Sequence, residues 1–310
     1  MKKIEFSFPS SCDGVSVAAY IYEPEIAPRA ILQISHGMCE YIGRYENFAE
    51  YLCGRGILVC GNDHIGHGGT AATDSDLGYI PRIGGGDMLV EDLHRTAQAV
   101  KERYPDLPHI LLGHSMGSFA ARIYGAKYGE ELDGLIIMGT GGPDNPTAMG
   151  KAVARLVGLG NGGRKRSKLI DGIAFGSYCK RFTGEDEHPK YAWLTRDREI
   201  VDKYAADKFC SSYLFTADGF YTLFDMIGRV SGKGWAHTLP KALPTLVVSG
   251  AEDPVGDYGR GVKKVYDALL AAGLTDLTLR LYPTDRHEIL NELDRNTVYA
   301  ELAEWLDARV

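Results

Sequence analysis

The stretch that decides the fold is HILLGHSMGSFAARIYGAKYG, residues 109–129, in which a short apolar run ends at a serine set between two glycines. A helix-like pattern begins directly after Ser115. A nucleophile at a sharp strand-to-helix turn needs small residues two positions to either side, so that strand and helix can approach, and Gly113 and Gly117 meet that need. The pattern predicts that Ser115 is a nucleophile exposed above the strand ends.

The same turn predicts where an oxyanion would be stabilised. It puts the backbone N–H of Met116 at a helix N-terminus, where partial positive charge favours a developing negative charge. A second donor is expected from the loop after an earlier strand. In QISHGMCEYIGRY, residues 33–45, His36 and Gly37 follow an apolar strand and leave the N–H of Met38 to point at the same spot. Met38 and Met116 are therefore the predicted oxyanion hole.

A serine nucleophile needs a base, and the base needs an orienting acid, in the chain order Ser, Asp, His. TLVVSGAEDPVG, residues 245–256, ends a strand pattern near Asp253, and LRLYPTDRHEIL, residues 279–290, ends the next one near His287. Open α/β sheets place their sites at these carboxyl ends of strands. Asp257 and Asp285 are competing acids, but Asp257 lies farther into its loop and Asp285 is two residues from His287, where its side chain would diverge.

Two rival sites are present in the sequence. Cys39 could be a nucleophile, but no nearby residue marks it as the partner of a base, so a small loop residue is the favoured interpretation. Asp63, His64 and His67 in NDHIGHGGT, residues 62–70, could ligate a metal, but no further ligand motif supports a metal centre and a tight structural loop is favoured. The sequence predicts neither a metal nor a cofactor.

Strand and helix patterns alternate from about residue 30 onward, which implies crossover units and a mostly parallel sheet flanked by helices. Residues 4–10 and 15–24 flank an Asp13–Gly14 turn signal and are predicted to form an antiparallel hairpin at one edge. No clear strand pattern occurs from residue 142 to 239. The sequence predicts an α/β core of residues 1–141 and 240–310, with an inserted helical cap of residues 142–239.

Composition excludes several function classes. The 310 residues are 45% hydrophobic and 24% charged, as in an ordinary globular protein, and the formal net charge of −7 gives no reason to bind nucleic acid. The start has two lysines without a following apolar run, and no uncharged run reaches membrane-spanning length, which favours a cytoplasmic protein. The six scattered cysteines form no close pair and are expected to be reduced thiols.

Five stretches together resemble a known family: SHGMCEYIGRY, NDHIGHG, GHSMGS, GAEDPVG and DRHEIL. They are similar to the monoacylglycerol lipase and lysophospholipase branch of the α/β-hydrolases, which is grouped with the serine aminopeptidase-like hydrolases. The match spans nearly the whole chain, and residues 191–221 also resemble the cap of bacterial members. The resemblance implies Ser115 as nucleophile, Asp253 and His287 as its partners, and the Met38 and Met116 amides as oxyanion hole.

The expected function is cleavage of carboxylic esters, of the monoacylglycerol or lysophospholipid type, through an acyl-enzyme on Ser115. A serine aminopeptidase-like amidase and a non-catalytic binding module stay open as alternatives. An aminopeptidase would need acids for the substrate amine, and Glu185, Asp186 and Glu187 form an acidic run that is interpreted as solvated surface. Transient contact of the cap with a membrane or micelle also stays open. Aromatic cap residues that could line an apolar route are Phe175, Tyr178, Phe182, Tyr213, Phe215, Phe220, Tyr221 and Phe224.

Overall fold

The computed structural model describes residues 1–142, 147–182, 188–232 and 234–310. Strands in this part of the chain form one eight-stranded sheet in the order β1-β2-β4-β3-β5-β6-β7-β8. The strands are β1 Lys2–Pro9, β2 Ser16–Glu23, β3 Ala30–Ser35, β4 Ile57–Asn62, β5 His109–His114, β6 Gly134–Met138, β7 Thr245–Gly250 and β8 Leu277–Tyr282.

Helices alternate with these strands, as the sequence pattern predicts. The α-helices are α1 Glu46–Cys53, α2 Gly85–Lys101, α3 Met116–Tyr128, α4 Thr147–Val157, α5 Lys168–Phe175, α6 Arg198–Ala206, α7 Ala217–Ser231, α8 Arg260–Ala271 and α9 Arg295–Asp307. Single-turn 3-10 helices are η1 Ile42–Tyr45, η2 Gly68–Thr70, η3 Gly129–Glu131, η4 Tyr178–Arg181, η5 Trp235–Thr238 and η6 Ile289–Asn291.

The sheet is mostly parallel, and its antiparallel part is the predicted hairpin. β1 pairs with β2 along its whole length, β2 pairs antiparallel with β4, and all other neighbours are parallel. Gly14 in the connecting turn has a φ of 76°, which glycine adopts without steric cost. The predicted fold class, a mostly parallel sheet flanked by helices, is confirmed.

Helices cover both faces of the sheet because alternate side chains of each central strand point to opposite faces. In β5, Leu111 packs in a cluster with residues of α2, α3 and α8. Its neighbours Ile110 and Leu112 pack in a second cluster with residues of α1 and α9. All residues of the central strands β3 to β7 are buried, which explains their continuous apolar runs.

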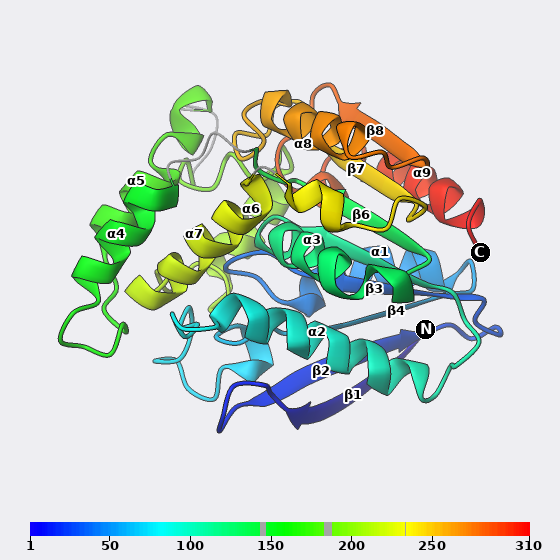
Figure 1. The fold of residues 1–310 in the computed structure, drawn as a ribbon, viewed down its shortest axis with the longest axis horizontal. Coiled ribbons are helices and arrows are strands. Elements are labelled where there is room, and N and C mark those ends of the chain that lie inside the picture. The colour runs from blue at the N-terminus through cyan, green and yellow to red at the C-terminus, as the bar shows by residue number, and fades with distance from the viewer. Residues whose placement is uncertain (143–146, 183–187, 233) are drawn as a thin grey trace.

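Along the chain, the helices α4 to α7 follow β6 and precede β7, although these two strands are neighbours in the sheet. Figure 1 shows α4 and α5 outside the layered core on one side, whereas both chain termini lie on the other. In the described part of this segment the β structure is limited to one isolated bridge between Arg166 and Thr216. The segment is therefore helical where it is described, and its division from the core at residues 142 and 239 stays a prediction.

Candidate active site

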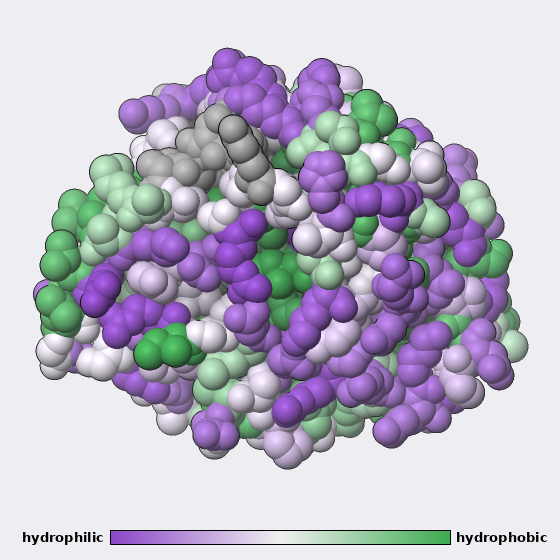
Figure 2. Space-filling model, viewed as in Figure 1, coloured by the Kyte–Doolittle hydropathy of each residue, from purple (hydrophilic) through white to green (hydrophobic). Residues whose placement is uncertain are grey.

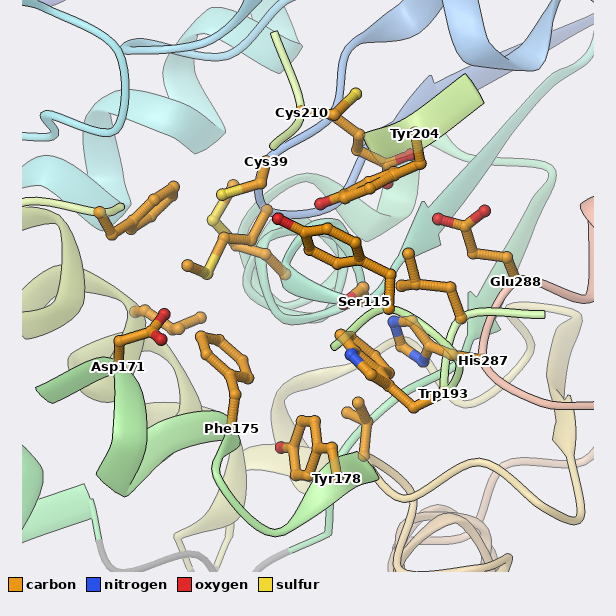
Figure 3. Close-up of a pocket in the computed structure, with 18 of the residues that line it drawn as sticks. Cys39, Ser115, Asp171, Phe175, Tyr178, Trp193, Tyr204, Cys210, His287 and Glu288 are labelled. Atoms are coloured by element: carbon orange, nitrogen blue, oxygen red, sulfur yellow. The ribbon is translucent and has the colours of Figure 1, made fainter. Parts of the chain in front are cut away.

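A cavity of about 330 Å³ lies between the carboxyl ends of the strands and the helices α5 to α7. Ser115 and His287 both line it, together with the proposed oxyanion residues Met38 and Met116. Figure 3 shows Ser115 near the middle of this cavity with His287 beside it. The fold thus brings four of the five predicted site residues to one surface, and Asp253 lies behind His287.

Ser115 occupies the turn between β5 and α3 in a strained backbone conformation, with φ 53° and ψ −120°. Its N–H donates to the carbonyl of Met138 at 3.0 Å, which ties the turn to β6. A Cβ at Gly117 would collide with the carbonyls of Ser35 and His36, and a Cβ at Gly113 would collide with Gly117. Both glycines are thus required for the close packing of strand and helix.

Asp253 and His287 form a buried pair. The two side chains are 0% and 2% exposed, and His287 Nδ1 lies 2.9 Å from Asp253 Oδ2. The other carboxylate oxygen, Oδ1, accepts the Val255 N–H at 2.8 Å, and Oδ2 also accepts the Ser249 hydroxyl at 3.2 Å. Because the carboxylate accepts, the His287 proton resides on Nδ1 and Nε2 is left as the basic nitrogen.

The two competing acids have other partners. Asp257 is exposed and forms a two-pronged ion pair with Arg260, at 2.7 and 3.0 Å. Asp285 Oδ1 accepts from Arg196 at 2.7 Å. Neither carboxylate bonds to His287 in the described part of the chain, so Asp253 is the acid that the geometry favours.

The turn at Gly37 lies directly against Ser115, since a Cβ on Gly37 would come within 2.9 Å of the Ser115 Cβ. The N–H of Gly37 donates to Glu40 Oε1, which fixes the orientation of the turn before Met38. Glu40 is buried, and its Oε1 also accepts the Tyr45 hydroxyl at 2.9 Å and faces His114 Nδ1 at 3.1 Å. The turn that carries the Met38 amide is therefore held by a buried carboxylate.

Positive charges keep Glu40 ionised. Burial opposes its ionisation, but the hydrogen bond and charge of His114 and the charge of Arg44 hold the pKa of Glu40 well below its usual range. Burial likewise opposes the charged form of His114, and Glu40 outweighs it and raises the pKa of His114. The buried ring of His114 also lies 4.8 Å from the His287 ring, centre to centre.

Arg44 joins this network to the residue after His287. It donates to Glu288 at 2.6 and 2.8 Å and to Glu40 at 3.2 Å, and it lies over the Tyr204 ring at 4.8 Å. Glu40, Arg44 and Glu288 were not predicted from the sequence as site residues. Glu40 and Arg44 are four residues apart, a spacing that suits an ion pair, but nothing in the sequence links them to Glu288, which lies 244 residues from Arg44.

Cys39 lines the cavity but does not have the properties of a nucleophile. Burial raises the pKa of its thiol to about 12, a shift that a hydrogen bond with Tyr213 only partly offsets. The thiolate, which is the reactive form, is therefore scarce at neutral pH. No histidine bonds to Cys39 in the described part of the chain, and this agrees with the interpretation of Cys39 as a loop residue.

The rival metal residues have structural partners. Asp63 accepts the N–H groups of Ile42 and Gly69, at 2.9 and 2.7 Å. His64 Nε2 lies 3.0 Å from the Ser35 hydroxyl, and His67 Nδ1 lies 3.0 Å from the carbonyl of Ile65. These groups hold the loop beneath the site together, as expected for a tight structural loop.

The aromatic residues of the predicted cap divide into two sets. Phe175, Tyr178, Tyr213 and Phe215 line the cavity. The other four do not line it: Phe220, Tyr221 and Phe224 of α7 pack in or against the core cluster that also contains Tyr213 and Phe215, and Phe182 is buried with the Arg286 guanidinium 4.1 Å from its ring centre. Trp193, Tyr204 and Phe119 line the cavity although the sequence analysis did not select them. The acidic run Glu185, Asp186 and Glu187 lies outside the described residues.

In the part of the chain that the structure describes, no helix is both long and apolar enough to cross a membrane.

The chain is similar to known proteins in sequence and in fold. Residues 26–294 match the family model described as serine aminopeptidase, S33. The chain is 27% identical to a monoacylglycerol lipase of Mycolicibacterium smegmatis, covering 97% of this chain and 96% of the relative, and 26% identical to human monoglyceride lipase, covering 96% and 89%.

A solved carboxyl esterase from Bacillus coagulans, in complex with glycerol, is 31% identical with a TM-score of 0.90, covering 100% of this chain and 99% of that one. The match to the family model spans most of the chain, and this structural likeness extends over all of it. The chain belongs to the serine aminopeptidase S33 family and has the α/β-hydrolase fold.

Proposed function

We propose that this chain is a serine hydrolase that cleaves carboxylic esters through an acyl-enzyme on Ser115. His287 Nε2 takes the Ser115 proton as the hydroxyl attacks the ester carbonyl, and the Met38 and Met116 amides stabilise the oxyanion. His287 then protonates the leaving alcohol, and water releases the acid by the same steps. The observation that carries the proposal is the buried Asp253–His287 pair, whose histidine lines the same cavity as the strained Ser115.

The proposed substrates are lipid esters of the monoacylglycerol or lysophospholipid type. Two lines of support are the aromatic and aliphatic side chains that dominate the cavity lining and the named activities of the M. smegmatis and human relatives. Residues 142–239 act in this proposal as a cap over a core of residues 1–141 and 240–310. The cap supplies Phe175, Tyr178 and Tyr213 to the acyl route.

A series of p-nitrophenyl esters from two to sixteen carbons tests the substrate class. Each acyl methylene that the cavity buries contributes up to about 0.8 kcal/mol to transition-state binding, or about fourfold in kcat/KM, until the cavity is full. We expect kcat/KM to climb with chain length and then level off. A flat series would contradict an apolar acyl site.

One residue, Asp171, supports the alternative function of an aminopeptidase. Asp171 on α5 lines the cavity, and its carboxylate makes no hydrogen bond or ion pair within the described part of the chain. Burial raises the pKa of Asp171, against the effect of Lys190. A substrate amine could bind there. Figure 3 shows Asp171 and His287 on opposite sides of Ser115.

Aminoacyl anilides separate the two functions. The parent protein, Asp171→Asn and the triple variant Glu185→Gln/Asp186→Asn/Glu187→Gln are assayed beside the ester series. The ester proposal expects anilide cleavage to be at least about a hundredfold slower than the best ester and independent of these acids, since no amine has to be held. Anilide cleavage that depends on them, with a flat ester series, would establish the peptidase instead.

Membrane or micelle contact is proposed for the outer surface of α4 and α5. Large apolar side chains are exposed there and on the connecting loop: Met149, Leu156, Leu159, Leu169 and Ile173. Figure 2 shows apolar residues gathered over this side of the molecule. The stretch 164–168, which leads into α5, is basic, but two of its residues bond to other parts of the protein. Arg164 pairs with Asp76, and Arg166 donates to the carbonyls of Leu77 and Leu214.

Flotation with neutral phosphatidylcholine vesicles tests this contact. We expect Leu156→Ser/Leu159→Ser to reduce the bound fraction, because each serine removes apolar surface that the bilayer would bury. Leu270→Ser on α8 is a matched control, since Leu270 is also exposed but lies away from α4 and α5. Equal binding of all three proteins would contradict the assignment of this surface.

A further inference from the structure

The segment just before α6 is fastened to the loop that carries His287. Successive residues on the two segments pair with one another, and most of the contacts involve backbone atoms. They are Arg286 Nη1 to the Ala192 carbonyl at 2.6 Å, the His287 N–H to the Trp193 carbonyl at 3.4 Å, the Glu288 N–H to the Leu194 carbonyl at 2.7 Å, and the Thr195 hydroxyl to the Asn291 carbonyl at 2.9 Å.

Arg196 is the charged centre of this contact. Its Nε donates to Glu292 Oε2 at 2.9 Å and its backbone N–H to Glu292 Oε1 at 3.2 Å. Its Nη2 donates to Asp285 Oδ1 and Asp294 Oδ1, both at 2.7 Å. The side chains of Asp285 and Glu292 are completely buried, whereas that of Arg196 is 25% exposed. One guanidinium therefore bridges two carboxyl groups that have no access to solvent.

Glu292 transmits this contact to the site. Its Oε1 accepts the N–H of Arg286 at 2.9 Å, and Arg286 is the residue immediately before His287. The carbonyl of Asp285 accepts the N–H of Glu252, the residue before Asp253, at 2.9 Å. Both buried partners of Arg196, Glu292 and Asp285, thus bond directly to the backbone beside one member of the Asp253–His287 pair.

The segment also touches the imidazole itself. The Trp193 ring lies 4.9 Å from the His287 ring, centre to centre, and both line the cavity. Figure 3 shows the two side chains against each other beside Ser115. A shift of residues 192–196 would therefore move both the loop behind His287 and the ring in front of it.

We propose that Arg196 is a positioning residue for the reaction: by bridging Glu292 and Asp285, it holds residues 192–196 against the His287 loop and keeps the imidazole directed at Ser115. The proposal rests on the proposed function, in which His287 is the base. It assigns to this segment a fixed place on the core rather than the role of a moving lid. Without the guanidinium, the buried carboxyl groups of Glu292 and Asp285 lose a hydrogen-bond donor and the loop loses its fixed position.

The test compares Arg196→Met with Arg196→Lys, using the full chain and a short p-nitrophenyl ester. Methionine keeps much of the length of the side chain and removes its charge, and lysine restores the charge without the forked geometry. We expect Arg196→Met to lower kcat by roughly ten- to a hundredfold with KM changed less than about threefold, because a misplaced base slows the chemical steps more than binding. Arg196→Lys should recover part of the lost kcat.

Lys203→Met is the matched control, since Lys203 also pairs with an acid, but it lies on α6 itself, where both Lys203 and its partner Glu199 are exposed. It should keep the parent kcat. Amide hydrogen exchange gives a readout that is independent of activity: exchange at His287 and Glu288 should rise in Arg196→Met and not in Lys203→Met. If Arg196→Met does not fold, the same comparisons are made with Arg196→Lys and Glu292→Gln, both of which are expected to lower kcat and raise exchange.

A parent-like kcat together with parent-like exchange in the Arg196 variants would overturn the inference, as would a change confined to KM. Failure of the proposed function looks different. In that case the parent protein would not be labelled by a fluorophosphonate at Ser115, or His287→Ala would keep full activity, whatever the Arg196 variants do.

Discussion

His287 Nδ1 and Asp253 Oδ2 lie 2.9 Å apart in a setting from which solvent is excluded, and the carboxylate has two further donors, Ser249 and Val255. These donors hold the carboxylate in place against the imidazole. The pair arises because β7 and β8 are parallel neighbours, so the loops after them emerge at the same edge of the sheet.

Replacement of Asp253 should remove most of the activity. Asp253→Asn would present an amide N–H to His287 and favour the wrong tautomer, with an expected loss of about a thousandfold or more in kcat. Asp257→Asn and Asp285→Asn should stay within about tenfold of the parent, because neither acid bonds to His287. The measurement is kcat for ester hydrolysis by the three purified variants. A large loss of kcat in Asp257→Asn instead of Asp253→Asn would show that Asp257 is the acid that orients His287.

Ser115→Ala should lower ester turnover by roughly three or more powers of ten, and the remaining rate would reflect the oxyanion hole and binding. The fold should be retained, since removal of the hydroxyl leaves the glycine-flanked turn intact. Labelling by a fluorophosphonate, followed by peptide mass spectrometry, should mark the parent at Ser115 alone. Labelling of Cys39 with an active Ser115→Ala protein is the result that would refute this assignment.

Glu40→Gln should lower kcat by roughly ten- to a hundredfold with little change in KM. Glutamine keeps the size of the side chain but removes the charge that balances Arg44 and His114, so the turn before Met38 is less firmly oriented toward the oxyanion. Steady-state kinetics with a short ester measure the effect. Glu46→Gln, at a half-exposed glutamate that pairs with Lys3 and accepts the Tyr22 hydroxyl, serves as the control and should match the parent in kcat, because it lies outside the site.

Asp285 should make the protein less stable as the pH rises. Burial, and then Glu292 and Asp294, raise the pKa of Asp285 to about 7, although Arg196 opposes the shift. Between about pH 4 and pH 7 the folded state keeps a proton that the unfolded state has lost, so stability decreases with rising pH through that range. The asparagine of Asp285→Asn is neutral at every pH, so the stability of this variant lacks the decrease that the ionisation of Asp285 causes.

Thermal unfolding of the parent and of Asp285→Asn at pH 5 and pH 8 tests the sign. The Tm of the parent should fall relative to that of the variant on going to pH 8. A parent Tm that gains on the variant over the same interval would show that the carboxylate form is the one that the fold stabilises.

Much of the arrangement was predictable because it depends on local patterns. The strands were predicted from short β-rich runs and the hairpin from Asp13–Gly14, and both are confirmed. The strained turn at Ser115 was predicted from Gly113 and Gly117. The physical reason for both glycines is that a Cβ at either position would collide with neighbouring backbone atoms. In the cap the aromatic pattern was less informative, because helix periodicity alone does not tell a residue on the cavity, such as Phe175, from one packed in the core, such as Phe220.

The sequence by itself determined the sheet, the strained turn at Ser115 and the order in which Ser115, Asp253 and His287 follow their strands, because these depend on residues close together in the chain. The tertiary structure alone decided which charges surround the site. Glu40, Arg44 and Glu288 form one buried network although 244 residues separate Arg44 from Glu288, and Arg196 reaches the His287 loop across 96 residues. Such pairs form because an unpaired charge is costly in the low dielectric of the interior. Its partner is whichever opposite charge the fold brings close, however distant in the chain.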